Sequence, residues 1–253
     1  MQTRLYTEHE LAPEQELELG AEAAQYLGRV LRLKPGERLR LFNGRDGEFD
    51  AELLTLGKNR LTLRLGRQRV AMSSAATESP LRLRLVQGVS RGDRMDTVIQ
   101  KATELGTRRI SPVLTQFGMV RFDDKRASKR REHWQRVANS AAEQCGRIQP
   151  TAVDLPVRLN DWFGRERLRE ATRLILDPSG KASLKDALRS DPPAAGASLC
   201  LLIGPEGGFS ERELDDARVA GFKCVALGPR VLRTETAAIA AVTLAQSVCG
   251  DLD

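Results

Sequence analysis

The chain has 253 residues, of which 41% are hydrophobic and 29% are charged, a balance that excludes a disordered or collagen-like chain. No apolar stretch approaches the length of a membrane span, and the acidic N-terminus lacks a signal peptide's apolar core, so we expect a cytoplasmic protein. The net charge of +6 rests mainly on arginine, which binds phosphate well, so nucleic acid is a first candidate partner.

The first 72 residues are typical of a small β-barrel-like domain with one helix. Four apolar residues come first, at helical spacing: Ala23, Leu27, Val30 and Leu31. From Arg38 onward apolar and polar residues alternate, and Asn43-Gly44 and Asp46-Gly47 are strong hairpin signals. Residues 73–80 are small and polar, which predicts a linker.

Residues 81–253 alternate between strand and helix patterns. The predicted strands are 81–89, 110–114, 172–177, 198–204 and 222–228. The predicted helices are 91–105, 125–145, 181–189, 211–221 and 234–249. This alternation predicts an α/β domain with a parallel sheet that is covered on both faces.

The stretch LLIGPEGGFSERELDDA, residues 201–217, runs from a buried strand through a glycine-rich loop into a helix. Ser210 and Glu213 have the spacing of a capping box, which marks the helix start. Open α/β sheets bind ligands at such strand ends, although a plain turn would explain Gly204–Gly208 taken alone.

A second loop of this kind, LGPRVLRTETAA, spans residues 227–238. A helix cap at Thr234 and a favourable charge at Glu235 would account for those two residues, but not for Arg230 or Arg233. Two glycine-bearing loops at neighbouring strand ends can enclose a ligand through backbone groups.

Other common chemistries lack their motifs. No G-x-G-x-x-G follows the first strand of the α/β region, and residues 177–184 depart from a Walker loop. No G-x-S-x-G nucleophile is present. With two histidines, and four cysteines that form no Cys-x-x-Cys pair, no metal is expected.

Four long motifs in order resemble those of the bacterial 16S rRNA uracil-N3 methyltransferases, a branch of the SPOUT superfamily. They are residues 91–106, 133–147, 202–210 and 227–238. Residues 26–44 resemble that family's PUA-like RNA-binding domain. Two stretches depart from the family pattern, Gln25-Tyr26 and Thr115–Gly118, where RNA contacts are expected to differ.

The resemblance implies two domains. Residues 1–72 would form an N-terminal PUA-like β-barrel, and residues 81–253 would form an α/β, SPOUT-type trefoil-knotted methyltransferase domain. The resemblance also implies S-adenosylmethionine as cofactor, 16S rRNA as substrate and a homodimer. The residues expected to bind the cofactor are Leu202, Ile203, Gly204, Pro205, Gly207, Gly208, Leu227, Gly228, Val231, Leu232 and Thr236.

Methylation at uracil N3 requires an exposed base whose N3 proton is removed. An arginine beside the uracil oxygens would stabilise the resulting anion, and Arg233 is our candidate. Glu206 is the candidate proton acceptor, with Glu235 as the alternative, although Glu206 could equally fix its loop by accepting backbone hydrogen bonds. The candidate RNA contacts are Arg29, Arg32, Lys34, Arg91, Arg94, Lys101 and Arg147.

Three other hypotheses stay open at this point. The first is a related SPOUT methyltransferase that acts on another base or on tRNA. The second is an RNA-binding assembly factor that keeps the fold without turnover, which the absence of cofactor binding would reveal. The third, methylation of a small molecule, is disfavoured by the attached β domain and the arginine content.

Overall fold

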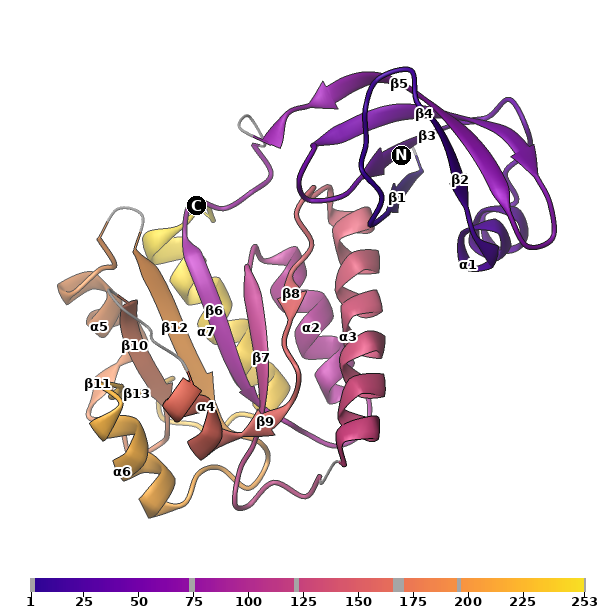
Figure 1. Cartoon of the computed structure of the whole chain (residues 1–253). Helices are drawn as coiled ribbons and strands as arrows, with labels where there is room; N and C mark the ends of the chain where they lie inside the picture. The colour runs from indigo at the N-terminus through magenta and orange to yellow at the C-terminus, as the bar shows by residue number, and fades with distance from the viewer. Residues whose placement is uncertain (1–2, 73–75, 121–122, 166–170, 195–196, 253) are drawn as a thin grey trace. The chain divides into compact units, whose positions relative to one another are not determined.

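A computed structural model describes residues 3–72, 76–120, 123–165, 171–194 and 197–252 (Figure 1). The chain forms two compact units, and each is described by itself. The first unit comprises Met1–Glu78 together with Ala142–Gln149, and the second comprises Ser79–Ala141 together with Pro150–Asp253. No described helix is long and apolar enough to cross a membrane.

The first unit contains a five-stranded sheet in the order β1-β3-β4-β5-β2. Its strands are β1 (Arg4–Tyr6), β2 (Glu16–Leu19), β3 (Arg38–Phe42), β4 (Glu48–Leu56) and β5 (Leu61–Val70). Strand β1 pairs with β3 in parallel, and the other neighbours are antiparallel. The end strands β1 and β2 form no ladder with each other in the described chain, so the predicted barrel-like unit is an open half-barrel.

The sequence signals for the β3–β4 hairpin are confirmed. Gly44 and Gly47 have φ values of +75° and +95°, which residues other than glycine rarely adopt. The amide of Asn43 donates to the Asp46 carboxylate at 2.6 Å and fixes the turn. Alternate leucines of the flanking strands, such as Leu39 and Leu53, are fully buried.

The predicted N-terminal helix is short and changes type along its length. Helix α1 (Ala21–Gln25) continues directly into a π-helical turn, η1 (Tyr26–Val30). A π turn adds a residue to each turn, so the spacing of an ordinary helix no longer applies. As a result Leu27 is buried, whereas Val30, which regular helical spacing would place on the same face, is 66% exposed.

The second unit contains an eight-stranded sheet in which the described strand pairs are all parallel. The order is β11-β13-β10-β12-β6-β7-β8, and β9 also pairs with β7. The strands are β6 (Arg82–Gly88), β7 (Arg109–Leu114), β8 (Ala152–Val153), β9 (Val157–Arg158), β10 (Ala171–Leu176), β11 (Ala182–Ser183), β12 (Ser198–Ile203) and β13 (Lys223–Ala226).

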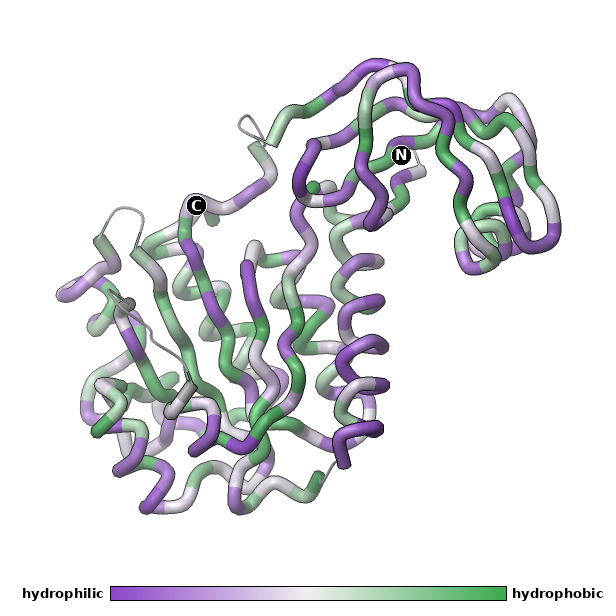
Figure 2. Tube along the Cα trace, in the orientation of Figure 1, coloured by the Kyte–Doolittle hydropathy of each residue, from purple (hydrophilic) through white to green (hydrophobic). Residues whose placement is uncertain are grey.

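Helices cover both faces of this sheet, as the alternating pattern predicted. The helices are α2 (Arg94–Glu104), α3 (Asp124–Cys145), α4 (Leu159–Arg165), α5 (Leu184–Ser190), α6 (Glu211–Val219) and α7 (Thr234–Cys249). One buried cluster joins α2, α3, α5 and α7 to the sheet, and another joins α4 and α6 to it. Figure 2 shows a hydrophobic centre of the sheet and long hydrophilic stretches along α3.

The strands alternate between the two clusters. In β12, Leu201 and Ile203 belong to the α7 side and Leu202 belongs to the α6 side.

Two helix starts illustrate the limits of periodicity. Helix α7 begins at Thr234 as predicted, whereas α2 begins at Arg94 rather than Arg91, because Gly92 has a φ of +62° that breaks the helix.

Candidate functional site

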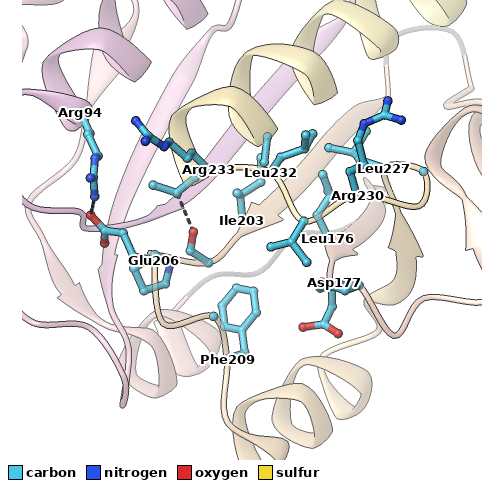
Figure 3. A pocket seen from close by; sticks show the side chains of 18 residues that line it. Arg94, Leu176, Asp177, Ile203, Glu206, Phe209, Leu227, Arg230, Leu232 and Arg233 are labelled. Atoms are coloured by element: carbon cyan, nitrogen blue, oxygen red, sulfur yellow. Dashed lines mark hydrogen bonds and ion pairs between the residues drawn. The ribbon is translucent and has the colours of Figure 1, made fainter.

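A pocket of about 360 Å³ lies at the carboxyl ends of β10, β12 and β13 (Figure 3). Its volume is in the range of sites for small organic ligands. The lining residues are Arg94, Leu176, Asp177, Pro178, Ile203, Gly204, Pro205, Glu206, Gly208, Phe209, Leu227, Gly228, Arg230, Val231, Leu232, Arg233, Thr234 and Ala237. Arg94 and Glu206 lie at one end of it, and Leu227 and Arg230 lie at the other.

The β12–α6 loop forms one wall. Its backbone turns back at Gly208, whose N–H donates to the Pro205 carbonyl at 2.9 Å and whose φ is +67°. The predicted capping box between Ser210 and Glu213 is present and fixes the start of α6. A Cβ at Gly88 would lie 2.4 Å from Pro205, so the end of β6 supports the loop from behind.

The β13–α7 loop forms the facing wall, and a buried hydrogen-bond bridge joins it to the first loop. Thr234 does not cap its helix: its hydroxyl donates to the Gly204 carbonyl at 2.7 Å. The same hydroxyl accepts from the Gln87 amide at 2.9 Å, and that amide also donates to the Gly88 carbonyl. Gln87 is fully buried, so this bridge sets the spacing of the two loops from within the core.

The end of β10 supplies a third wall, which sequence reasoning missed. Leu176, Asp177 and Pro178 line the pocket. As a sequence, residues 177–184 resemble only an incomplete Walker loop. The available signal was the position of Asp177 directly after a predicted parallel strand, where ligand sites lie.

The charged end of the pocket carries two carboxylates around one guanidinium. Arg94 forms an ion pair with Glu206, and its Nε lies 3.8 Å from a carboxylate oxygen of Glu235. Glu206 also accepts a hydrogen bond from the Arg91 backbone N–H at 3.2 Å. Partial burial acts to raise the pKa of Glu206, but hydrogen bonds from the N–H groups of Glu206 and Arg91 and from Arg94 hold it below its ordinary value.

The structure brings most of the predicted pocket residues together. Eight of them line the pocket: Ile203, Gly204, Pro205, Gly208, Leu227, Gly228, Val231 and Leu232. Leu202 does not, because it packs into the core on the α6 side. Gly207 packs outward against Phe117, and Thr236 is exposed in the first turn of α7. Of the predicted catalytic residues, Glu206 and Arg233 line the pocket, and Glu235 reaches it through Arg94.

The predicted RNA contacts fall into different environments. Arg29, Arg32, Lys34 and Arg91 are exposed. Lys101 pairs with Glu104 on the same helix, and Arg94 belongs to the pocket.

Arg147 requires a correction. Its side chain is buried and pairs with Glu78 at 2.9 Å, and its backbone carbonyl accepts from the Arg4 guanidinium. Arg147 therefore ties residues 142–149 into the first unit and offers RNA no accessible charge. From the sequence alone, a basic residue in a polar stretch gives no signal that distinguishes an RNA contact from a buried ion pair.

Within the described ranges no group of three or more His, Cys, Asp or Glu side chains is placed to hold a metal ion.

Known proteins share both the sequence and the fold. Residues 77–246 match the family described as an RNA methyltransferase domain, and residues 19–66 match an RNA methyltransferase PUA domain. A protein of Buchnera aphidicola named ribosomal RNA small subunit methyltransferase E is 32% identical over 251 residues, which cover 98% of this chain and 97% of the relative.

Two solved structures match over their whole length. A protein from Legionella pneumophila, solved in complex with the bound cofactor SAM, has a TM-score of 0.90 and 38% identity, with 100% of both chains covered. A ribosomal RNA small subunit methyltransferase E from Neisseria gonorrhoeae, bound to S-adenosyl methionine, has a TM-score of 0.87 and 34% identity, again with 100% of both chains covered.

Proposed function

We propose, from the premise that this chain belongs to the RNA methyltransferase family, that it methylates N3 of a uridine in 16S rRNA. The coarser part of the proposal is methylation of rRNA with S-adenosylmethionine as methyl donor. It is supported by the names of the relatives and by the cofactor bound in their structures. The uracil N3 target is the finer part of the proposal. The pocket at the three strand ends is the observation on which the proposal rests.

The pocket residues suit S-adenosylmethionine. Ile203, Leu227 and Leu232 offer apolar surface for a purine ring, and glycines such as Gly204 leave backbone groups accessible for hydrogen bonds. The Asp177 carboxylate would hold a hydroxyl or ammonium group. When bound, S-adenosylmethionine supplies an electrophilic methyl group on a sulfonium sulfur.

The residues of this chain would prepare the uracil for attack. A protonated N3 is a poor nucleophile, so the site has to accept that proton and stabilise the anion that remains. Arg233 lines the pocket and is our candidate to hold the uracil oxygens. Holding the base in line with the methyl group would supply much of the acceleration, because it removes the entropy cost of a bimolecular encounter.

The contacts of the two carboxylates favour Glu235 over Glu206 as the proton acceptor. Glu206 is held by Arg91 and Arg94, and its lowered pKa makes it a weak base. One oxygen of Glu235, Oε2, is buried and accepts no hydrogen bond from the described residues, and its contact with the Arg94 Nε is long, at 3.8 Å. We therefore propose that Glu206 anchors its loop to the start of α2 and that Glu235 accepts the proton.

Glu206→Gln separates these two roles. We expect cofactor binding to weaken about five-fold, because an amide cannot replace a charge-assisted bond to Arg94, while the maximal rate changes less than about three-fold. Calorimetry and single-turnover methylation measure the two quantities. A fall in rate of about 100-fold, with cofactor affinity unchanged, would instead make Glu206 the base.

The first unit is our proposed module for binding RNA, through the exposed cations Arg29, Arg32 and Lys34. Replacing all three by Gln should weaken rRNA binding about tenfold and flatten its salt dependence, because each phosphate contact releases counterions. Replacing Lys185, Arg189 and Arg218, which are exposed in the second unit, is the matched control. Equal losses in both variants would mean that general charge, rather than this patch, binds the RNA.

The proposed target is tested by mapping methylated nucleotides in small-subunit rRNA by mass spectrometry, with and without the gene. We expect one uridine to lose a methyl group, and purified protein with cofactor to restore it. A modified base other than uracil, or a methyl group away from N3, would overturn the finer proposal and leave the methyltransferase family assignment intact.

A further inference from the structure

The segment that follows β7 exposes two large apolar side chains. Phe117 is 48% exposed and Met119 is 63% exposed, although most large apolar side chains of this unit are in its core. Isolated exposed apolar residues are common on protein surfaces. These two are notable because the chain holds their segment in a fixed place.

Three contacts fix this segment. The Gln116 N–H donates to a Glu213 carboxylate oxygen at 2.8 Å, and Glu213 is itself the buried partner in the capping box of α6. The Gly118 N–H closes a turn onto the Thr115 carbonyl at 3.2 Å. A Cβ at Gly207 would lie 2.8 Å from both the Cβ and the carbonyl oxygen of Phe117, so the two backbones are in direct contact.

The contact with Gly207 places Phe117 next to the loop that lines the pocket, because Gly207 lies between the lining residues Glu206 and Gly208. Gly207 follows Glu206, which lies at the charged end of the pocket next to Arg94. The Arg91 backbone donates to that same carboxylate, and the Arg91 side chain is exposed. An exposed aromatic residue and an exposed cation therefore both contact this one short loop.

We propose that Phe117 is a stacking surface for an unpaired base of the RNA substrate. The inference rests on the proposed function and adds the residue that receives the base. A base drawn out of its helix loses its stacking neighbours, and an aromatic side chain at the site entrance replaces them. Arg91 contacts the same loop through its backbone N–H, and its exposed side chain would offer a counter-charge to the phosphate of such a nucleotide.

The size of the patch favours a nucleotide over a protein partner. A stable protein interface needs about 800 Å² on each side, with a central apolar region. Phe117 and Met119 alone offer far less than this. A single base needs only one ring face.

Substitutions at Phe117 test the proposal in the full-length protein. We expect Phe117→Ala to raise the KM for rRNA about tenfold, to change kcat less than about threefold, and to leave the cofactor Kd unchanged. Phe117→Trp should restore the KM, and Phe117→Leu should not, because leucine is apolar but cannot stack. Val219→Ala is the control, since Val219 is 90% exposed at the end of α6 and is no pocket residue.

A second measurement does not depend on methyl transfer. Fluorescence of Phe117→Trp should be quenched by an unstructured uridine-containing oligoribonucleotide and not by an abasic one, after subtraction of wild-type signal from the buried Trp134 and Trp162. Quenching without methylation would keep the subsite and reject the proposed reaction. The stacking proposal is wrong if Phe117→Leu restores the KM as well as Phe117→Trp does, or if no quenching occurs. It is also wrong if Phe117→Ala changes the sedimentation coefficient, because Phe117 would then be a contact between copies of the chain.

Discussion

Arg233→Lys is expected to slow methyl transfer about 100-fold while leaving cofactor affinity nearly unchanged, on the scale of a lost oxyanion donor. Arg233 immediately precedes α7, lines the pocket and is exposed. In the described chain it has no carboxylate within ion-pair distance, whereas Arg94 is held by Glu206. A guanidinium that is free in the protein is available to an anionic uracil edge.

Lysine retains the charge but loses the planar fork that can bind two points at once. Losing an interaction that forms mainly in the transition state therefore lowers kcat and leaves the cofactor Kd nearly unchanged. Single-turnover methylation of rRNA measures the rate, and calorimetry measures cofactor affinity. Arg230→Lys is the matched control, because Arg230 lines the opposite end of the same pocket.

Two other outcomes would reassign Arg233. Equal losses of rate and of cofactor affinity would make it a residue that binds the cofactor or holds the loop. An unchanged rate in Arg233→Lys, together with a slow Arg230→Lys, would move the anion-binding role to Arg230.

Local signals predicted the elements that build the pocket well. The Ser210 and Glu213 pair located the start of α6, because a capping box is formed by residues three apart. Helix α7 could be bounded at both ends from its composition, and Gly204–Gly208 was identified as a loop at a strand end. These features depend on neighbouring residues, so a single sequence contains them.

Features that depend on distant residues were not predictable in this way. Asp177 joins the pocket because β10 pairs with both β12 and β13, and no local pattern specifies that order. The burial of Arg147 depends on Glu78, which is 69 residues away. The exposure of Val30 follows from a π turn, for which the helical spacing of the segment gave no sign.

The bridge through Gln87 is the other non-local feature, and breaking it should have the second largest effect. Gln87→Leu is expected to weaken cofactor binding about 30-fold with little change in Tm. The loss of the amide leaves the Gly88 carbonyl and a Thr234 lone pair without a donor in the core, which costs about 1–3 kcal/mol and loosens the two loops. Overall stability should hold, because the Gln87 carbonyl oxygen has no partner among the described residues and leucine removes it from the core.

A double-mutant cycle with Thr234→Val separates a bridge from two independent packing effects. Thr234→Val removes both the bond to Gly204 and the bond from Gln87, so adding Gln87→Leu to it should cost little more. Thr236→Val is the control, since it lies on the same helix turn, is exposed and does not line the pocket. Additive losses of cofactor affinity would mean that the two residues act separately. A lowered Tm with unchanged affinity would mean that Gln87 stabilises the core without positioning the loops.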